Sequence, residues 1–358
     1  MQLIDNPHRP AGLGPEAGLA AGRVRRDPAA ALALLARCPV AATTPLWERP
    51  RLAHALGVGR LLLKDERGRM GLGSFKALGA AHAIAQEAER RAAGGPLTSA
   101  LADQVYVCAS AGNHGLSVAV GARTFGARAV IHLAASVPEA FAGRLRALGA
   151  EVVRSGDDYE AAMAAAAGAA EEHGWTLLSD SSWPGYTELP TRVMEGYLVV
   201  GDEVANELER PPSHVFLQAG VGGLAAALTA LFRARWGDDP VIVVVEPEAA
   251  PALAESIRAG RPVATAGPAS CMGRLDCKEP SHLALAELAR GADWFVTIGE
   301  EEATAAVALL ERHGLATTPS GAAGVAALQH LGRDRERLGL TADSTALVFV
   351  SEGREDPP

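Results

Sequence analysis

Short apolar runs rich in β-branched residues alternate along this chain with long Ala-rich stretches, and this alternation most limits the folds open to it. Parallel strands need a crossover of a dozen or more residues, and each Ala-rich stretch is long enough to form a helix. The pattern therefore predicts an α/β protein with largely parallel sheets. The expected strands are 105–108, 129–133, 151–153, 176–178, 215–217, 241–245, 294–298 and 346–350.

Helices are expected at 115–124, 139–148, 159–173 and 224–233. Residues 181–201 contain two prolines and several glycines, which predict a connection between two groups of strands. A chain of 358 residues usually divides its core into two domains. We therefore expect a large domain from residues 1–77 and 186–358 and a small α/β domain from residues 78–185.

Charge and composition exclude several classes of protein. The formal charge of −9 argues against a nucleic-acid partner, which needs clustered basic residues. The apolar runs fall short of the roughly 20 residues that a membrane span requires, and the first residues do not resemble an export signal. The four cysteines lack the spacing of a metal or redox pair, so we expect reduced thiols, no metal site and a cytoplasmic location.

Lysine is rare in this chain, which narrows the search for a reactive amine. Only Lys64, Lys76 and Lys278 occur among 33 basic residues. Lys76 follows two glycines and Ser74 at a loop-to-helix junction, where the serine can cap the helix. The positive end of the helix dipole disfavours the ammonium form, so we expect a neutral, nucleophilic amine at Lys76. An ordinary exposed lysine is the alternative.

Two glycine-containing turns each follow a predicted strand and precede a predicted helix. Residues 110–115, Ser-Ala-Gly-Asn-His-Gly, could seat a substrate carboxylate on amides at the helix N-terminus. Residues 218–224 contain three glycines whose amides could hold a phosphate monoester. This second turn lacks the spacing of nucleotide-binding loops, which disfavours a dinucleotide or ATP. Plain strand-to-helix turns remain the alternative for both.

Polar residues at two strand ends are further candidates. Ser351 follows the last strand, where its hydroxyl could hydrogen-bond a pyridine nitrogen. Asp180 follows the strand 176–178 and could act as an acid or base if burial raises its pKa, although it could equally cap a turn. Residues 271–280, CMGRLDCKEP, either line a pocket or form a solvated loop.

Together, the segments 64–85, 110–115, 179–186, 218–225, 271–280 and 351–353 resemble fold-type II pyridoxal-phosphate enzymes, and their order is especially similar to the diaminopropionate ammonia-lyase branch. The resemblance runs from about residue 44 to residue 353. It implies a fold like that of the tryptophan synthase β chain, with two three-layer α/β/α domains and pyridoxal 5′-phosphate between them. It also implies a homodimer.

The resemblance also implies roles for individual residues. Lys76, next to Phe75, would form the Schiff base with the cofactor, while Asn113 would contact its phenolic oxygen and Ser351 its ring nitrogen. The implied phosphate site comprises Gly220, Val221, Gly222, Gly223 and Leu224. The implied substrate-carboxylate site comprises Ser110, Ala111, Gly112, Asn113 and His114.

The implied reaction is α,β-elimination from a small β-substituted amino acid, which gives a 2-oxo acid and ammonia. Lys76 would remove the α-proton and Asp180 would assist the leaving group. Two alternatives are a β-replacement synthase, in which a second nucleophile captures the intermediate, and a relative that binds an amino acid without catalysis.

One departure from the ammonia-lyase pattern concerns the substrate. Ala111 stands where that pattern has an aspartate, so the loop is instead similar to that of serine and threonine dehydratases. Residues 271–280 also carry more charge than the family's glycine-containing version. We therefore expect a substrate that resembles either 2,3-diaminopropionate or serine and threonine, and the departure at Ala111 indicates an altered specificity.

Overall fold

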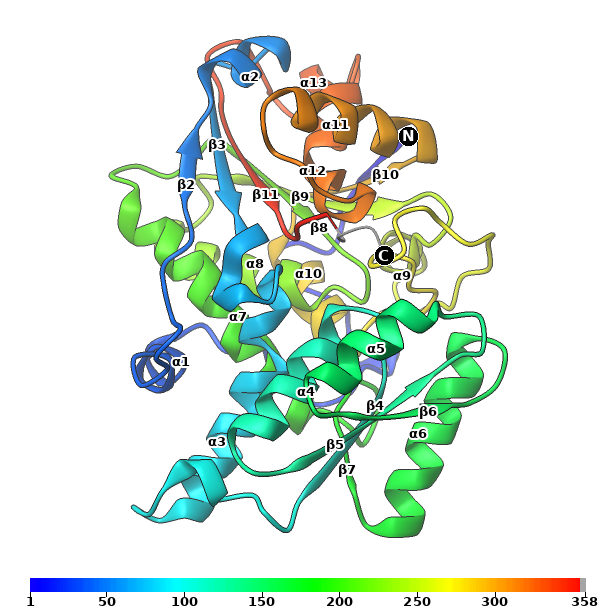
Figure 1. Cartoon of the computed structure of the whole chain (residues 1–358). Helices are drawn as coiled ribbons and strands as arrows, with labels where there is room; N and C mark the ends of the chain where they lie inside the picture. Colours follow the sequence, from blue (N-terminus) through cyan, green and yellow to red (C-terminus); the bar gives the residue numbers. More distant parts are fainter. Residues whose placement is uncertain (355–358) are drawn as a thin grey trace.

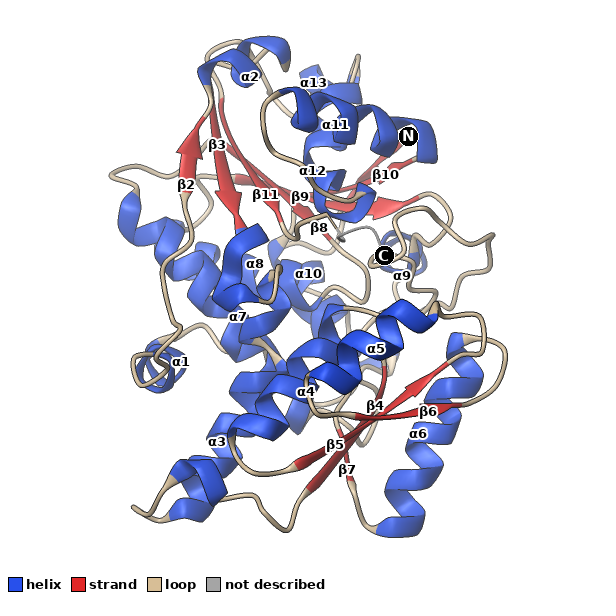
Figure 2. Ribbon diagram, viewed as in Figure 1, coloured by secondary structure: helices blue, strands red, loops and turns tan. Residues whose placement is uncertain are grey.

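The computed structural model describes residues 1–354, in which two sheets lie at opposite ends of the molecule with helices between them (Figures 1 and 2). In the larger sheet only the outer strands β1 and β2 pair antiparallel with their neighbours. Its order is β1 (Gln2–Asp5), β10 (Trp294–Ile298), β9 (Val241–Pro247), β8 (His214–Gln218), β11 (Thr345–Val350), β3 (Arg60–Asp65) and β2 (Leu46–Glu48).

The smaller sheet is parallel throughout, with the order β6 (Glu151–Arg154), β5 (Arg128–Leu133), β4 (Val105–Ala109) and β7 (Thr176–Leu177). The helices are α1 (Ala29–Leu35), α2 (Pro50–Ala55), α3 (Ala80–Ala92), α4 (Asn113–Thr124), α5 (Glu139–Ala147), α6 (Tyr159–His173), α7 (Glu188–Glu207), α8 (Gly223–Trp236), α9 (Ala252–Ala259), α10 (His282–Gly291), α11 (Glu300–Arg312), α12 (Pro319–His330) and α13 (Asp334–Arg337). Four 3₁₀ helices join them, η1 (Pro15–Ala17), η2 (Glu66–Gly71), η3 (Phe75–Leu78) and η4 (Leu97–Ser99).

Each sheet is covered by helices on both faces, because successive side chains of a buried strand point to opposite sides. In β8, Leu217 belongs to the core cluster that includes α7 and α8, whereas Phe216 belongs to the cluster that includes α11 and α12. In β4, Cys108 packs with α4 and Val107 packs with α6. Both halves are therefore three-layer α/β/α structures, which agrees with the predicted fold class.

All eight predicted strands are present, with ends that differ by at most two residues. The N-terminal strands β1, β2 and β3 were not predicted. β1 and β2 have only four and three residues, and they owe their extended form to pairing with β10 and β3. Strands of the larger sheet thus come from both ends of the chain. The domain boundaries at 77/78 and 185/186 stay a prediction, and residues 355–358 of the expected large domain lie outside the described part.

The prediction of a connection over 181–201 holds for residues 181–187 and was wrong beyond them, since α7 begins at Glu188 and continues for 20 residues. Pro190 lies in its first turn, where a missing N–H breaks no helical hydrogen bond. Gly196 marks a close contact rather than a break, because a Cβ there would lie 1.9 Å from the carbonyl oxygen of Leu78. Two of the residues that suggested a loop, Pro190 and Gly196, therefore belong to the start and the packing of a helix.

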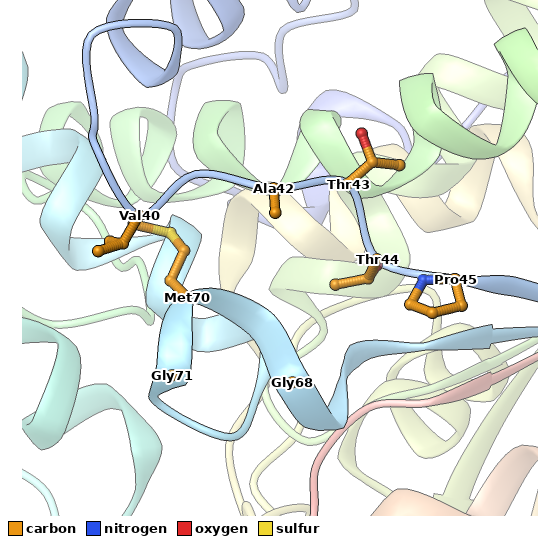
Figure 3. A pocket seen from close by; sticks show the side chains of 8 residues that line it. All are labelled: Val40, Ala42, Thr43, Thr44, Pro45, Gly68, Met70 and Gly71. Carbon is orange, nitrogen blue, oxygen red and sulfur yellow. The ribbon is translucent and has the colours of Figure 1, made fainter.

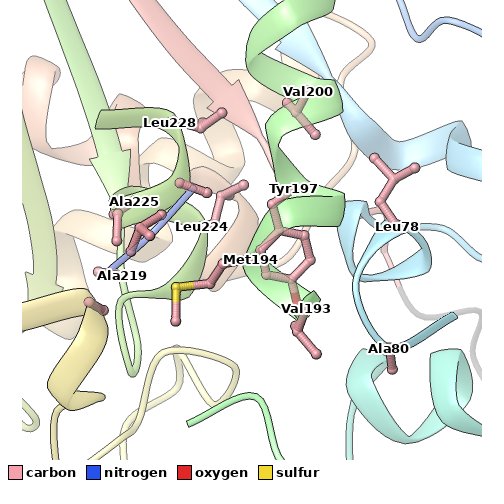
Figure 4. Close-up of a cluster of buried hydrophobic side chains, with 14 of the residues drawn as sticks. Leu78, Ala80, Val193, Met194, Tyr197, Val200, Ala219, Leu224, Ala225 and Leu228 are labelled. Atoms are coloured by element: carbon pink, nitrogen blue, oxygen red, sulfur yellow. The ribbon is translucent and has the colours of Figure 1, made fainter. Parts of the chain in front are cut away.

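A buried cluster between the two sheets holds η3 against α7 and α8. Figure 4 shows Tyr197 of α7 between Leu78 on one side and Met194 and Leu224 on the other. Tyr197 is 1% exposed and its ring lies edge-on to Phe75 at 5.0 Å between centroids. The segment that carries Lys76 is thus packed against α7, and Tyr197 of α7 separates it from the start of α8. No helix among residues 1–354 is long and apolar enough to cross a membrane.

Candidate active site

Lys76 lies in η3, a single 3₁₀ turn that is tied to the C-terminal end of β11. Ser74 caps this turn as predicted, and its Oγ accepts a hydrogen bond from the Lys76 N–H at 3.2 Å. The Phe75 N–H donates to the Ser351 carbonyl at 3.2 Å. These backbone bonds bring Lys76 next to Ser351 although the two are far apart in the sequence.

The Nζ atom of Lys76 contacts Oδ2 of Asp180, and each side chain keeps about a fifth of its surface exposed, 19% and 20% respectively. Burial disfavours the ammonium form, but the charge and the hydrogen bond of Asp180, together with contributions from Tyr197 and Cys277, raise the pKa of Lys76. Burial likewise disfavours the Asp180 carboxylate, but the charge and the hydrogen bond of Lys76, together with a contribution from His114, lower the pKa of Asp180. In the cofactor-free protein the two groups therefore form an ion pair.

This ion pair corrects two expectations. The neutral amine expected at Lys76 was wrong, because η3 has only four residues and its dipole is small beside a full negative charge in contact. The raised pKa considered for Asp180 was also wrong, because the strand-end carboxylate is buried with a cation rather than alone. Neither partner is close to the other in sequence, so local pattern could not reveal the pairing.

The loop 110–115 joins β4 to α4 and is shaped by its own serine. Ser110 Oγ accepts hydrogen bonds from the N–H groups of Gly112 and Gly115, at 3.3 and 3.0 Å. Asn113 is the first residue of α4, and its Nδ2 donates to Glu352 at 2.5 Å. The α4 N-terminus and its first amides thus lie beside Glu352, which directly follows Ser351.

The His114 side chain points away from this loop surface. It is 6% exposed, and its Nε2 donates to the Leu178 carbonyl at 2.8 Å. Burial lowers the pKa of His114, so the ring is neutral. Within the predicted carboxylate site, His114 therefore presents its backbone rather than its imidazole.

The predicted phosphate loop, residues 220–224, joins β8 to α8 and has a backbone that only glycine allows. Gly222 has φ of +100°, and a Cβ there would lie 3.0 Å from Ala284 and Leu253. A Cβ at Gly220 would lie 2.9 Å from the Cys277 sulfur. Neighbouring side chains therefore leave no room for a larger residue at Gly220 or Gly222. The loop lies at the N-terminus of α8, where the first amides of a helix can bind an anion.

Ser351 lies close to this loop. Its Oγ accepts a hydrogen bond from Nε2 of Gln218, the last residue of β8, at 3.2 Å. Gln218 is buried, and its Oε1 has no hydrogen-bond partner among the described residues. These groups fit pyridoxal phosphate. The glycine loop 220–224 fits its phosphate, the amine of Lys76 fits its aldehyde, and the hydroxyl of Ser351 fits its ring nitrogen.

Tyr197 was not a candidate from the sequence, whereas Arg274, Cys277 and Glu352 lie in the candidate segments 271–280 and 351–353 but had no assigned role. Lys76 Nζ lies 5.8 Å from the Tyr197 ring centroid. Cys277 lies against the glycine loop, and burial raises the pKa of its thiol to about 12. Arg274 Nη1 donates to the Ala111 carbonyl at 2.9 Å. Residues 271–280 therefore lie against the site, which favours the first of the two interpretations of this segment, a pocket lining, over a solvated loop.

A hollow of about 280 Å³ lies between the segment 40–45 and η2 (Figure 3). It is lined by Val40, Ala42, Thr43, Thr44, Pro45, Gly68, Met70 and Gly71. None of these residues is a predicted site residue. Among residues 1–354 no group of three or more His, Cys, Asp or Glu side chains could hold a metal ion.

Residues 39–352 match the family model described as pyridoxal-phosphate dependent enzyme. The chain belongs to this family. Diaminopropionate ammonia-lyase of Escherichia coli K12 is 31% identical over 344 residues, which cover 87% of this chain and 85% of that protein. A biosynthetic L-threonine dehydratase of Mycobacterium tuberculosis H37Rv is 29% identical and covers 89% of this chain and 69% of its own length.

Solved structures of pyridoxal-phosphate dependent enzymes have the same fold. The crystal structure of Escherichia coli diaminopropionate ammonia-lyase in complex with an aminoacrylate-PLP azomethine reaction intermediate superposes with a TM-score of 0.87. It is 28% identical, and the match covers 98% of this chain and 93% of that one. Threonine deaminase of T.th. is also 28% identical, with a TM-score of 0.75 and a match that covers 92% of this chain and 99% of that one.

These findings confirm the resemblance, the fold class and pyridoxal 5′-phosphate as the cofactor. They also confirm the prediction of a lyase of the ammonia-lyase and dehydratase type. The roles of individual residues stay predictions.

Proposed function

We propose that this chain is a pyridoxal-phosphate dependent lyase that uses Lys76 and Asp180 to eliminate a β-substituent from a small amino acid, giving a 2-oxo acid and ammonia. The contact between the Lys76 amine and the Asp180 carboxylate carries this proposal. It supports the pairing of a base, Lys76, with a proton carrier, Asp180, and we propose the loops 220–224 and 110–115 for the phosphate and the carboxylate.

Pyridoxal phosphate supplies an electron sink for the electron pair left on the α-carbon when a proton is removed there. Lys76 would hold its aldehyde carbon, with the amides of residues 220–224 on its phosphate. Asn113 would contact its phenolic oxygen and Ser351 its ring nitrogen. Phe75 packs on Tyr197 and so keeps this side of the site apolar.

The chain's own residues can carry the proton transfers. The amides of residues 110–114 would hold the substrate carboxylate, which orients the α-hydrogen toward Lys76. Lys76 Nζ must be neutral to take that proton, and Asp180, which contacts Nζ, can accept the proton that the ammonium gives up. Asp180 could then protonate the departing group. Water finally converts the released enamine to the 2-oxo acid and ammonia.

The first test locates the reactive amine. Borohydride reduction of the holoenzyme followed by peptide mass spectrometry should place the pyridoxyl label on Lys76. Lys64 and Lys278 serve as internal controls, because they are the only other lysines. A label on either of these, or no label, would contradict the proposal.

The second test measures the reaction. A panel of β-substituted alanines should release 2-oxo acid and ammonia in equal amounts, and Lys76→Ala should abolish this turnover. Holoenzyme that turns over no member of the panel would refute elimination. New amino acids formed with added thiols or amines, without net ammonia, would indicate β-replacement instead.

We also propose a large domain of residues 1–77 and 186–358, a small domain of residues 78–185, a homodimer, and action in the cytoplasm. The origin of the strands of each sheet supports the division. The free cysteines, including exposed Cys271, favour a reducing compartment. The homodimer rests on family analogy, and light scattering after size-exclusion chromatography tests it.

A further inference from the structure

Gln218, the last residue of β8, lies beside the C-terminal end of β11 with its side-chain amide against three oxygen atoms. Its Nε2 lies 3.0 Å from the Phe349 carbonyl oxygen, 3.4 Å from the Gly321 carbonyl oxygen and 3.2 Å from Oγ of Ser351. Gln218 is 3% exposed and Ser351 is 4% exposed. The contact between these two side chains is therefore shielded from solvent.

The two carbonyl oxygens fix which way the Gln218 amide is turned. A carbonyl oxygen only accepts hydrogen bonds, so the amide atom that faces Phe349 and Gly321 must be the donor Nε2. The reverse orientation would bring Oε1 to 3.0 Å from the Phe349 oxygen, where two acceptors repel each other. Gln218 therefore donates to Ser351 and cannot accept from it.

This donation decides what the Ser351 hydroxyl can offer to a bound group. A hydroxyl has one hydrogen to donate and two lone pairs to accept with. Its Oγ already accepts from Gln218, and among residues 1–354 it donates no hydrogen bond. The Ser351 carbonyl accepts from the Phe75 N–H at 3.2 Å, which holds this residue beside the turn of Lys76. The hydroxyl hydrogen is thus left for a ligand of the site.

We propose that Gln218 is a positioning residue that makes the Ser351 hydroxyl a hydrogen-bond donor toward the ring nitrogen of the cofactor and so keeps this nitrogen unprotonated. The inference rests on the proposed function, in which Ser351 faces that nitrogen. A protonated ring would also donate to Ser351, and the buried hydroxyl hydrogen would then have no acceptor. Such an unsatisfied group favours the unprotonated ring by about one to two pH units.

The protonation of the ring bears on which reaction follows. Electron withdrawal from the α-carbon is weaker when the ring nitrogen carries no proton. An electron pair left at the α-carbon is then short-lived, which favours prompt loss of a β-substituent over reactions that must store the pair for longer. Gln218 thus favours elimination through Ser351.

The ring nitrogen of the bound cofactor gives a test that needs no turnover. Holoenzyme is prepared with pyridoxal phosphate that carries nitrogen-15 in its ring, and nuclear magnetic resonance near neutral pH reports whether this nitrogen is protonated. Free cofactor in acid and in alkali supplies the two reference signals. The wild type should give the unprotonated signal. Gln218→Met has a similar volume and no donor, so the hydroxyl can turn and accept from the ring, and the signal should move toward the protonated one.

Two controls separate this role from a general disturbance. Gln329 lies near the opposite end of α12 from Gly321 and also has a buried Oε1 without a partner, and Gln329→Met should give the wild-type signal. In a Ser351→Ala background, Gln218→Met should leave the signal unchanged, because the hydroxyl through which it acts is absent.

Gln218→Glu serves if Gln218→Met does not bind the cofactor. Burial keeps the new carboxyl group protonated, and its one hydrogen goes to the Phe349 carbonyl. Its oxygen then accepts from Ser351, so the signal should again move toward the protonated one.

Three results would overturn the inference: a protonated ring in the wild type, an unchanged signal when Gln218 is replaced, or an equal change with and without the Ser351 hydroxyl. Each of them leaves the proposed elimination to be judged by the panel of β-substituted alanines. Conversely, the expected signals without turnover of any member of that panel would refute the elimination and leave the role of Gln218 intact.

Discussion

Replacing Asp180 by Asn tests the ion pair at the centre of the site, and the cofactor-free protein is the right form because the cofactor occupies the Lys76 amine. Among residues 1–354, the substitution removes the one carboxylate in contact with Lys76 and leaves its ammonium poorly solvated. Breaking a buried pair in this way costs about 3–5 kcal/mol. Because each side chain is about one-fifth exposed, we expect the lower end, about 3 kcal/mol near pH 6.

The pH dependence of this loss follows from the directions of the two pKa shifts. In the wild type the pKa of Lys76 is raised above its value in the unfolded chain. Lys76 therefore contributes fully to the free energy of unfolding below the unfolded pKa, and this contribution is lost only as the pH rises through the folded pKa. The pKa of Asp180 is lowered below its value in the unfolded chain. Asp180 therefore contributes fully to the free energy of unfolding above the unfolded pKa, and this contribution is lost only as the pH falls through the folded pKa. The pair's contribution is therefore constant from about pH 5 to pH 9.

In Asp180→Asn, burial acts on Lys76 without its counter-ion and lowers its pKa below the unfolded value. The unfolded chain then binds the proton more tightly, so the stability of the variant rises with pH by up to about 1.4 kcal/mol per unit. Urea unfolding of both proteins between pH 6 and pH 9.5 measures this. The deficit should be largest at pH 6 and shrink toward pH 9.5.

Lys76→Met provides the matched background. Without the lysine, Asp180→Asn should cause no loss near neutral pH, because it then removes an unpaired buried carboxylate. A deficit that is the same at every pH, or that persists in the Lys76→Met background, would refute the reasoning.

Three further predictions concern other parts of the chain. Gly222→Ala should cost about 1–2 kcal/mol in urea unfolding and weaken cofactor binding, because φ is +100° and the new Cβ has no space. Glu203→Gln should cost about 3–5 kcal/mol because it leaves buried Lys64 without its carboxylate, whereas Glu89→Gln in an exposed pair should cost under about 1 kcal/mol. Burial raises the pKa of Glu246 from 4.5 to about 8. The protonated side chain therefore contributes fully to the free energy of unfolding below pH 4.5, and this contribution is lost as the pH rises from 4.5 through 8. Glu246→Gln should therefore flatten the pH dependence of stability between about pH 5 and 8, by up to about 1.4 kcal/mol per unit, in urea titrations.

The N-terminal strands show why some strands were not predicted. β1 is four residues long and gains its hydrogen bonds only by pairing with β10, which lies almost 300 residues later in the chain. A local apolar pattern cannot report a partner of that kind. The prolines and glycines of α7 show the opposite error, in which a local signal for a break is overruled by packing against Leu78.

Sequence alone determined the alternation of strands and helices, the parallel sheets and the two glycine-containing turns, because these depend on periodicity and on backbone preferences of neighbouring residues. The sequence also contains only three lysines that could form a Schiff base, and of these only Lys76 follows the glycines and the serine of the segment 71–76.

Only the tertiary structure decided the charge state of the site and the side chains that surround it. Asp180 meets Lys76 across more than 100 residues of chain, and Arg274 meets Ala111 across more than 160. A pKa and a substrate preference depend on which charges lie within a few ångströms, and folding rather than sequence distance sets that neighbourhood. The identity of these residues could be read from the chain, but their partners could not.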